Sequence, residues 1–345
     1  MEMMQYRPWE EKEVNEIISR VGEGQLPILD IQLGGQCSCA CEYCDDVSRR
    51  NLPCLINMDS IYRLICQGNV RGVYVCGIGE PTACSNFKKL MQLLDMCHEK
   101  NIWVSMYTNG LRLTERLLRY VDNGTLNLLY KYDTERINVA SKLYGIPKNM
   151  AMQQFANVMM LKDVIHNDNG VTNIGASIVP SSENIKEMRF LIKCCLKSGI
   201  FPMIGELENA GNCHKHYEEL KISDEELREI RKWMLQEYGI DYQVPVCPAT
   251  ISGIHIDNFG QAIIDSKTGL SCSWFWMEDP KMVRLGNIDE MSYEEIVNKI
   301  LEYRDSKYQE VLQMIDGICE HPFGGCGGDV KSLLETYTEV YQPRR

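Results

Sequence analysis

Six short apolar runs alternate with longer helix-forming stretches between residues 28 and 205, and this alternation limits the folds open to the chain. The runs cover residues 29–33, 72–76, 103–107, 126–130, 173–179 and 201–204. Helical periodicity fills the stretches 58–67, 87–100, 114–123, 150–164 and 183–198. Strands spaced by helices form parallel βαβ units. The pattern therefore predicts an α/β fold, an open or closed six-unit barrel whose chemistry lies in the loops after the strands.

Charge and hydropathy exclude several classes of partner. The 345 residues carry a net charge of −12, so the chain repels phosphodiester backbones and anionic membranes. We find no apolar run long enough to span a membrane, and the acidic N-terminus does not resemble a signal peptide. The sequence therefore predicts a cytoplasmic protein that binds neither nucleic acid nor membrane.

The character of the chain changes near residue 215. Ser223 and Glu226 have capping-box spacing and predict the start of one helix, and Ser292 and Glu295 predict the start of another. Between them, residues 253–265 have the pattern of a hairpin. We expect an N-terminal extension (1–27), a barrel (28–215), a helical linker (216–243) and a small irregular α+β domain (244–345).

Sixteen cysteines are the compositional outlier. With no sign of export, they indicate metal binding, catalysis or packing rather than disulfides. Cys37, Cys41 and Cys44 form a CxxxCxxC set directly after the first strand, and three thiolates on one loop suit an iron–sulfur cluster or zinc. A cluster held at three corners leaves one iron open to another molecule. Cys39 lies inside the set but outside its spacing.

These residues resemble the signature of the radical S-adenosylmethionine (SAM) superfamily. Further matching pieces follow in order: VCGIGEPT (75–82), YTNG (107–110), LYKYDT (129–134) and ASIVP (176–180). The resemblance covers about residues 28–210 and implies a partial (β/α)6 barrel. One departure is Ile78, which stands where a second glycine is common.

The resemblance also implies roles for individual residues. Cys37, Cys41 and Cys44 would hold a 4Fe-4S cluster whose open iron binds SAM, and Tyr43 would pack against adenine. The other expected contacts to SAM are Gly77, Gly79, Glu80, Thr108, Asn109, Lys131, Asp133 and Ser177. Lys131 is alternatively a contact to the substrate.

A second cysteine set follows the barrel. Cys247, Cys272, Cys319 and Cys326 are similar to the ligands of the twitch domain, a short relative of the SPASM domain. This resemblance implies one auxiliary 4Fe-4S cluster, and a structural zinc site is the alternative.

Candidates for proton and hydrogen transfer lie near residue 210. Glu206 and Glu208 would share a face if the sixth strand extended that far, and either could accept a proton from a substrate. Cys213 could donate a hydrogen atom to a substrate radical, which would make the reaction an epimerisation. Solvated carboxylates and a buried thiol are the plain alternatives. No spacing among the histidines indicates a ligand set.

The function implied by the resemblance is hydrogen abstraction by a 5′-deoxyadenosyl radical. We expect a small polar substrate such as an aminocyclitol, sugar or nucleotide sugar, giving dehydrogenation (an oxidoreductase) or epimerisation (an epimerase). Modification of a ribosomal peptide is the first alternative, and a non-catalytic iron–sulfur or zinc scaffold is the second. A flavodoxin or ferredoxin is the expected reducing partner.

Overall fold

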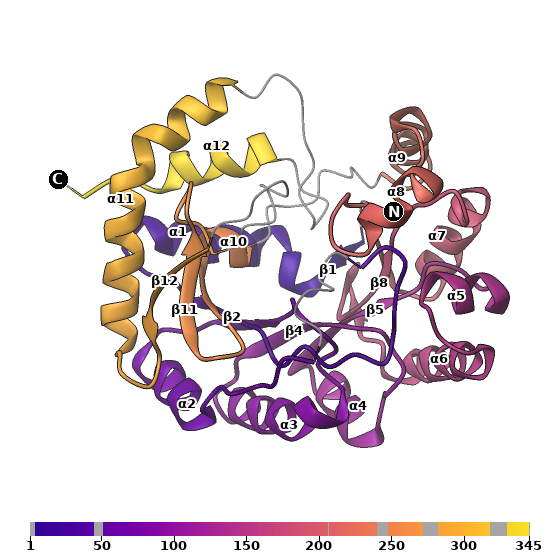
Figure 1. The fold of residues 1–345 in the computed structure, drawn as a ribbon, viewed down its shortest axis with the longest axis horizontal. Helices are drawn as coiled ribbons and strands as arrows, with labels where there is room; N and C mark the ends of the chain where they lie inside the picture. Colours follow the sequence, from indigo (N-terminus) through magenta and orange to yellow (C-terminus); the bar gives the residue numbers. More distant parts are fainter. Residues whose placement is uncertain are drawn as a thin grey trace.

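A computed structural model describes residues 4–44, 51–205, 207–239, 248–271, 282–317 and 330–344. Figure 1 shows their arrangement, with the two termini on the same side of the sheet as helix α1.

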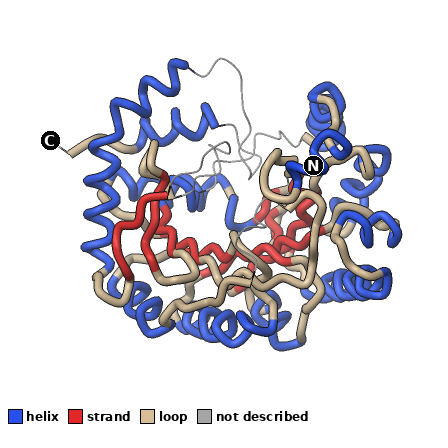
Figure 2. Tube along the Cα trace, in the orientation of Figure 1, coloured by secondary structure: helices blue, strands red, loops and turns tan. Residues whose placement is uncertain are grey.

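One curved nine-stranded sheet organises the molecule. Its spatial order is β12-β11-β10-β2-β3-β4-β5-β8-β9. Neighbours from β10 through β9 pair in parallel, whereas β11 pairs antiparallel with both β10 and β12. The strands are β2 (Ile28–Ile31), β3 (Gly72–Val75), β4 (Trp103–Thr108), β5 (Leu126–Lys131), β8 (Ile174–Ile178), β9 (Phe201–Ile204), β10 (Gly253–Ile256), β11 (Gln261–Asp265) and β12 (Met282–Asn287). In Figure 2 they follow an open arc.

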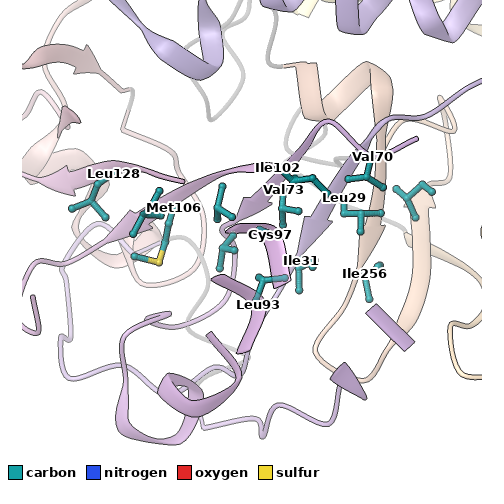
Figure 3. Close-up of a cluster of buried hydrophobic side chains, with 14 of the residues drawn as sticks. Leu29, Ile31, Val70, Val73, Leu93, Cys97, Ile102, Met106, Leu128 and Ile256 are labelled. Atoms are coloured by element: carbon teal, nitrogen blue, oxygen red, sulfur yellow. The ribbon is translucent and has the colours of Figure 1, made fainter. Parts of the chain in front are cut away.

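Helices cover the outer face of this arc because each strand turns alternate apolar side chains toward them. These helices are α2 (Met58–Gln67), α3 (Cys84–Glu99), α4 (Glu115–Asp122), α5 (Ile137–Leu143), α6 (Lys148–Met160) and α7 (Met188–Lys197). Figure 3 shows part of the core between the layers, where Leu29, Ile31 and Val73 of the strands pack near Leu93 and Cys97 of α3. The intervening residues of the strands face the inside of the arc.

The N-terminal extension fills the inner side of the sheet. It consists of β1 (Gln5–Tyr6), the 3-10 helix η1 (Arg7–Trp9) and α1 (Glu11–Gly22). Tyr6 is fully buried, and its hydroxyl lies 3.2 Å from Ser105 Oγ on β4. Ile17 of α1 packs in a second apolar cluster with Ile28 and Tyr74. The extension thus closes the inside of the arc beneath the strand ends.

The remaining elements flank the arc. A small three-stranded sheet consists of β1, β7 (Val171–Thr172) and β6 (Asn167–Asp168). Two further 3-10 helices are η2 (Leu161–Val164) and η3 (Ile185–Glu187). The C-terminal helices are α8 (Cys213–Leu220), α9 (Asp224–Tyr238), α10 (Pro248–Ser252), α11 (Tyr293–Gly317) and α12 (Val330–Val340). No helix in the described part of the chain has the length and apolarity needed to cross a membrane.

The α/β fold predicted from the apolar runs is confirmed, and all six predicted strands are present within two residues of their expected ends. The predicted hairpin forms as β10 and β11, but β10 also pairs with β2 and so extends the barrel sheet. Helix α5 was not predicted. The division of the chain at residues 215 and 243 stays a prediction.

Candidate functional site

The cysteine loop leaves the C-terminal end of β2 and is held by main-chain contacts to distant segments. The Ala40 N–H donates to the Tyr144 carbonyl just after α5, and the Glu42 N–H donates to the carbonyl of Leu143, the last residue of α5, at 2.9 Å each. Asn212, before α8, donates its N–H to the Cys44 carbonyl at 2.8 Å and its side-chain amide to the Cys41 carbonyl at 2.9 Å. The loop is therefore fixed from both sides.

The thiols on this loop differ in acidity. Cys39 is buried, and its hydrogen bonds to the neighbouring sulfurs raise its own pKa. The same bonds are the main cause that lowers the pKa of Cys37 to about 7 and of Cys41 to about 6. Lys131 Nζ lies 3.3 Å from Cys41 Sγ and lowers the pKa of that thiol further. Thiolates are the form that binds iron, so this loop is prepared for a soft metal group.

Glu80 joins the loop after β3 to the loop after β4. Its Oε1 accepts bonds from the Thr82 N–H (3.0 Å), the Thr82 hydroxyl (2.7 Å) and the Thr108 hydroxyl (2.7 Å). Its Oε2 accepts the Asn109 N–H at 2.7 Å. Both oxygens of this buried carboxylate are thus occupied. Glu80 therefore positions the two loops relative to each other.

Gly79 is required where two loops meet. Its φ is +73°, and a Cβ placed there would lie 2.5 Å from the Gly34 carbonyl oxygen. Only glycine fits this close approach of the GIGEP segment to the start of the cysteine loop. Gly77 also has a positive φ, of +98°, and packs against the Gln32 side chain.

Tyr43, Lys131 and Asp133 meet beside the cysteine loop. The Tyr43 hydroxyl donates to Asp133 Oδ2, and Lys131 Nζ lies 4.5 Å from the centroid of the Tyr43 ring. Asp133 Oδ1 accepts the Val179 N–H at 2.6 Å, and burial raises the pKa of this carboxyl. Ser177, on β8, is the register partner of Lys131. The structure therefore gathers Tyr43, Lys131, Asp133 and Ser177 at neighbouring strand ends.

Two buried amides on α6 complete the loop after β4, and sequence reasoning did not find them. Gln154 Nε2 donates to the Asn109 carbonyl at 2.7 Å, and Asn157 Nδ2 donates to the Gly110 carbonyl at 3.0 Å. The same loop brings Asn109 Nδ2 within 3.8 Å of Cys37 Sγ. In the sequence, Gln154 and Asn157 stand out only as polar residues on the buried face of an amphipathic helix.

Of the three candidates for proton and hydrogen transfer, the structure describes Glu208 and Cys213. Strand β9 ends at Ile204, so Glu208 lies in the following loop rather than on an extended strand, and Glu206 lies outside the described residues. Cys213 is fully buried at the start of α8, next in sequence to Asn212, which holds the cysteine loop.

The second cysteine set lies outside the described residues: Cys247, Cys272, Cys319 and Cys326. The described segments that adjoin two of them do meet. Ser271, next to Cys272 in sequence, donates its N–H to the Thr250 carbonyl at 3.2 Å, and Thr250 follows Cys247 by three residues. The fully buried Arg304 of α11 donates to the Ile251 carbonyl (2.8 Å) and the Gly269 carbonyl (2.9 Å).

A buried polar pair was also missed from the sequence. His255 on β10 and Asp30 on β2 are register partners, and His255 Nδ1 lies 2.7 Å from Asp30 Oδ2. Each residue is 3% exposed. Alternation along the GIHI strand predicts that His255 turns away from the apolar neighbours, but its partner depends on which strand lies alongside.

The residues fit an iron–sulfur cluster by donor chemistry. Two of the three signature thiols have lowered pKa values, and all three are on one fixed loop. Within the described ranges, no group of three His, Cys, Asp or Glu side chains is arranged around a single metal ion. A cubane cluster binds each thiolate at a separate corner and needs no such arrangement.

Comparison with solved structures identifies the fold. The crystal structure of Streptococcus suis SuiB bound to S-adenosylmethionine matches with a TM-score of 0.57 at 15% identity, over 93% of this chain and 77% of SuiB. Native anSMEcpe with bound AdoMet and a Kp18Cys peptide matches with a TM-score of 0.56 at 16% identity, over 91% of this chain and 95% of that one. No family model matches the chain, and no curated protein matches it.

The chain therefore has the fold of the radical SAM enzymes. Its cysteine, GIGEP and TNG loops lie at the C-terminal ends of adjacent strands, as the sequence resemblance predicted.

Proposed function

We propose that the chain is a radical SAM enzyme that abstracts hydrogen from a C–H bond of a small polar metabolite. Two observations support this proposal. Cys37 and Cys41 have lowered pKa values on a loop that is held by hydrogen bonds, and the neighbouring GIGEP and TNG loops are joined by the Glu80 carboxylate. When bound, a cluster with an open iron supplies the electron that splits SAM into methionine and a 5′-deoxyadenosyl radical.

The residues of this chain would hold and orient SAM. Cys37, Cys41 and Cys44 would be the cluster ligands, and the backbone of residues 77–80 would receive the methionine end. Lys131 would pair with the SAM carboxylate or with the substrate. Tyr43, already hydrogen-bonded to Asp133, presents a ring of fixed orientation for stacking on adenine.

Peptide modification is the second candidate. SuiB has been solved bound to its precursor peptide SuiA, and anSMEcpe with bound peptides. Their fold extends over more than nine-tenths of this chain. A ribosomal peptide is therefore the alternative substrate.

We also propose one auxiliary 4Fe-4S cluster on Cys247, Cys272, Cys319 and Cys326. Arg304 supports this proposal. Burial lowers the pKa of its guanidinium, and Nη2 has no hydrogen-bond partner in the described part of the chain. A buried cation favours a nearby anion, and a cluster with four thiolates is anionic.

The outcome is proposed as dehydrogenation or epimerisation, with Glu206 or Glu208 as proton acceptor or Cys213 as hydrogen donor. A flavodoxin or ferredoxin would supply the electrons. We propose a cytoplasmic location, because an enzyme with exposed thiols such as Cys66 and Cys84 and with iron–sulfur clusters needs a reducing compartment.

Anaerobic reconstitution with SAM and dithionite tests the proposal. The wild type should form 5′-deoxyadenosine, and Cys37→Ala, Cys41→Ala and Cys44→Ala should each abolish it. Cys66→Ala, at an exposed thiol of α2, is the matched control. Carbon-deuterated aminocyclitols, sugars and peptides then show which class transfers deuterium to 5′-deoxyadenosine. A reconstituted protein that cannot cleave SAM overturns the proposal.

A further inference from the structure

The buried pair of His255 and Asp30 stands apart from the loops already assigned. Asp30 uses both carboxylate oxygens: Oδ2 contacts His255 Nδ1 at 2.7 Å, and Oδ1 accepts from Cys76 Sγ at 3.3 Å. A carboxylate that accepts from Nδ1 fixes the proton of a neutral imidazole on that nitrogen. Nε2 is then left as an acceptor.

That acceptor is unused within the described residues. His255 Nε2 is buried and has no hydrogen-bond partner there. A structural core histidine usually satisfies both ring nitrogens, because an unpaired buried polar atom is costly. His255 Nε2 could therefore accept a hydrogen bond from a polar group that the described part of the chain does not provide.

The pair belongs to the inner face of the sheet, below the SAM loops. Asp30 alternates with Leu29 and Ile31 of the outer core, so its side chain turns inward. Two residues further along the same face of β2 is Gln32, which packs against Gly77 of the GIGEP loop. Tyr74 on β3 is the register partner of Asp30 and lies beside the pair, whereas Ile17 and Ile28 form an apolar floor on its other side. The dyad is therefore a polar layer between this floor and the loops.

Three ionisable side chains near the strand ends, Lys131, Glu80 and Asp133, already have partners in the described structure. Lys131 lies against Cys41 and the Tyr43 ring, and Glu80 is saturated by Thr82, Thr108 and Asn109. Asp133 accepts from Tyr43 and Val179. An acceptor nitrogen oriented by a carboxylate is the usual form of a histidine general base.

We propose that His255, oriented by Asp30, accepts the proton of a substrate hydroxyl or amine attached to the carbon that loses hydrogen. This inference rests on the proposed function and narrows it to the oxidation of an alcohol or amine, with His255 in place of Glu206 or Glu208 as the proton acceptor. The substrate carbon gives its hydrogen atom to the 5′-deoxyadenosyl radical, forming 5′-deoxyadenosine. The O–H or N–H proton passes to Nε2, the remaining electron passes to a one-electron acceptor of the iron–sulfur class, and a C=O or C=N bond forms.

The first test concerns the tautomer and needs no substrate. Nitrogen-15 NMR of histidine-labelled, anaerobically reconstituted protein should show the His255 proton on Nδ1 and a bare Nε2. The signal is assigned by its loss in His255→Gln, and Asp30→Asn should abolish the tautomer preference. A proton on Nε2 in the wild type overturns the proposal.

The second test measures coupling of hydrogen abstraction to oxidation. Its probes are the carbon-deuterated aminocyclitols, sugars and serine-containing peptides that label 5′-deoxyadenosine with the wild type. In His255→Gln, the ratio of oxidised product to 5′-deoxyadenosine should fall at least about 100-fold, the usual contribution of a general base. Added imidazole should restore part of the ratio in His255→Gly, which a purely structural role would not allow.

His98→Gln is the matched control, because His98 is exposed on α3 and bonds Thr125 at 2.8 Å. It should leave the ratio unchanged. An unchanged ratio in His255→Gln overturns the base assignment while the proposed function stands. If the wild type does not cleave SAM, the proposed function is wrong instead. The NMR test of the His255 tautomer does not depend on SAM cleavage, so it still shows whether Asp30 orients the imidazole.

Discussion

The Glu80 carboxylate accepts a 2.7 Å hydrogen bond from the Thr108 hydroxyl, so the loop after β3 and the loop after β4 are held by a single buried acid. The same carboxylate also binds the Thr82 and Asn109 N–H groups, at 3.0 and 2.7 Å. Two loops that would otherwise be independent therefore move as one unit.

Glu80→Gln should disrupt this unit. The side-chain amide can accept at only one end, so one backbone N–H loses its acceptor whichever way the amide is oriented. We expect a loss of about 1–3 kcal/mol in the free energy of unfolding. Calorimetry should show at least about tenfold weaker SAM binding, equivalent to about 1.4 kcal/mol. Glu99→Gln, at an exposed carboxylate of α3, should change neither quantity. Wild-type SAM affinity in Glu80→Gln would contradict the role of the clamp.

Gly79→Ala tests the close approach of the GIGEP segment to the cysteine loop. Both Gly79 and Gly239 have positive φ, of +73° and +66°, so alanine at either position costs roughly 1–2 kcal/mol of backbone strain. Only at Gly79 does the new Cβ meet backbone, at 2.5 Å, whereas nothing lies within 4 Å of it at Gly239. Gly79→Ala should therefore lose SAM binding and Gly239→Ala should keep it. Equal effects of the two substitutions on SAM binding would rule out the steric explanation.

Much of this framework follows from local sequence signals. The apolar runs predict the parallel strands, and the Ser223–Glu226 and Ser292–Glu295 spacings predict two capping boxes that the structure contains. These features depend on residues within a few positions of one another. The loop residues at the strand ends were found because the family resemblance fixed their order.

The missed features depend on distant pairing. His255 meets Asp30 across 225 positions, only because β10 pairs with β2. Tyr6 reaches Ser105 across 99 positions, and no local pattern predicts that an N-terminal segment fills the arc. Gln154 and Asn157 bind backbone carbonyls that do not differ in sequence from any others.

Tyr6→Ala should show that the N-terminal segment is part of the core. Tyr6 is fully buried, and loss of a large buried aromatic side chain costs about 3–5 kcal/mol. Tyr6→Phe removes only the contact to Ser105 and should cost about 1 kcal/mol. Tyr62→Ala, at a ring that is 39% exposed, is the control, with an expected loss below about 1 kcal/mol. Denaturant unfolding measures all three, and a mild Tyr6→Ala phenotype would mean that the segment is peripheral.

Arg304→Met tests the auxiliary cluster. Replacing a buried cation by an apolar side chain of similar size is often tolerated, so the fold should survive. If Arg304 balances an anionic cluster, reconstituted protein should keep the iron and sulfide of one cluster instead of two. Iron analysis and EPR measure this, with Arg119→Met, at an exposed position on α4, as the control. Full iron content in Arg304→Met would remove the support that Arg304 gives to the auxiliary site.

The capping box of α9 predicts a pH-dependent contribution to stability. The Ser223 N–H, at 2.9 Å, and then the Ser223 hydroxyl, at 2.8 Å, lower the pKa of Glu226 below its usual 4.5. A carboxylate with a lowered pKa stabilises the folded state above its unfolded pKa, and this contribution is lost as the pH falls through the folded value.

Glu226→Gln should therefore lower the amide protection of α9 near neutral pH, and the difference from the wild type should vanish in acid. Glu229→Gln, at an exposed position on the same helix, should show no such pH dependence. Hydrogen exchange of α9, compared between variants at each pH, measures the effect. A difference of equal size at both pH values would mean that the glutamate acts through its shape rather than its charge, because only the ionised form is lost in acid.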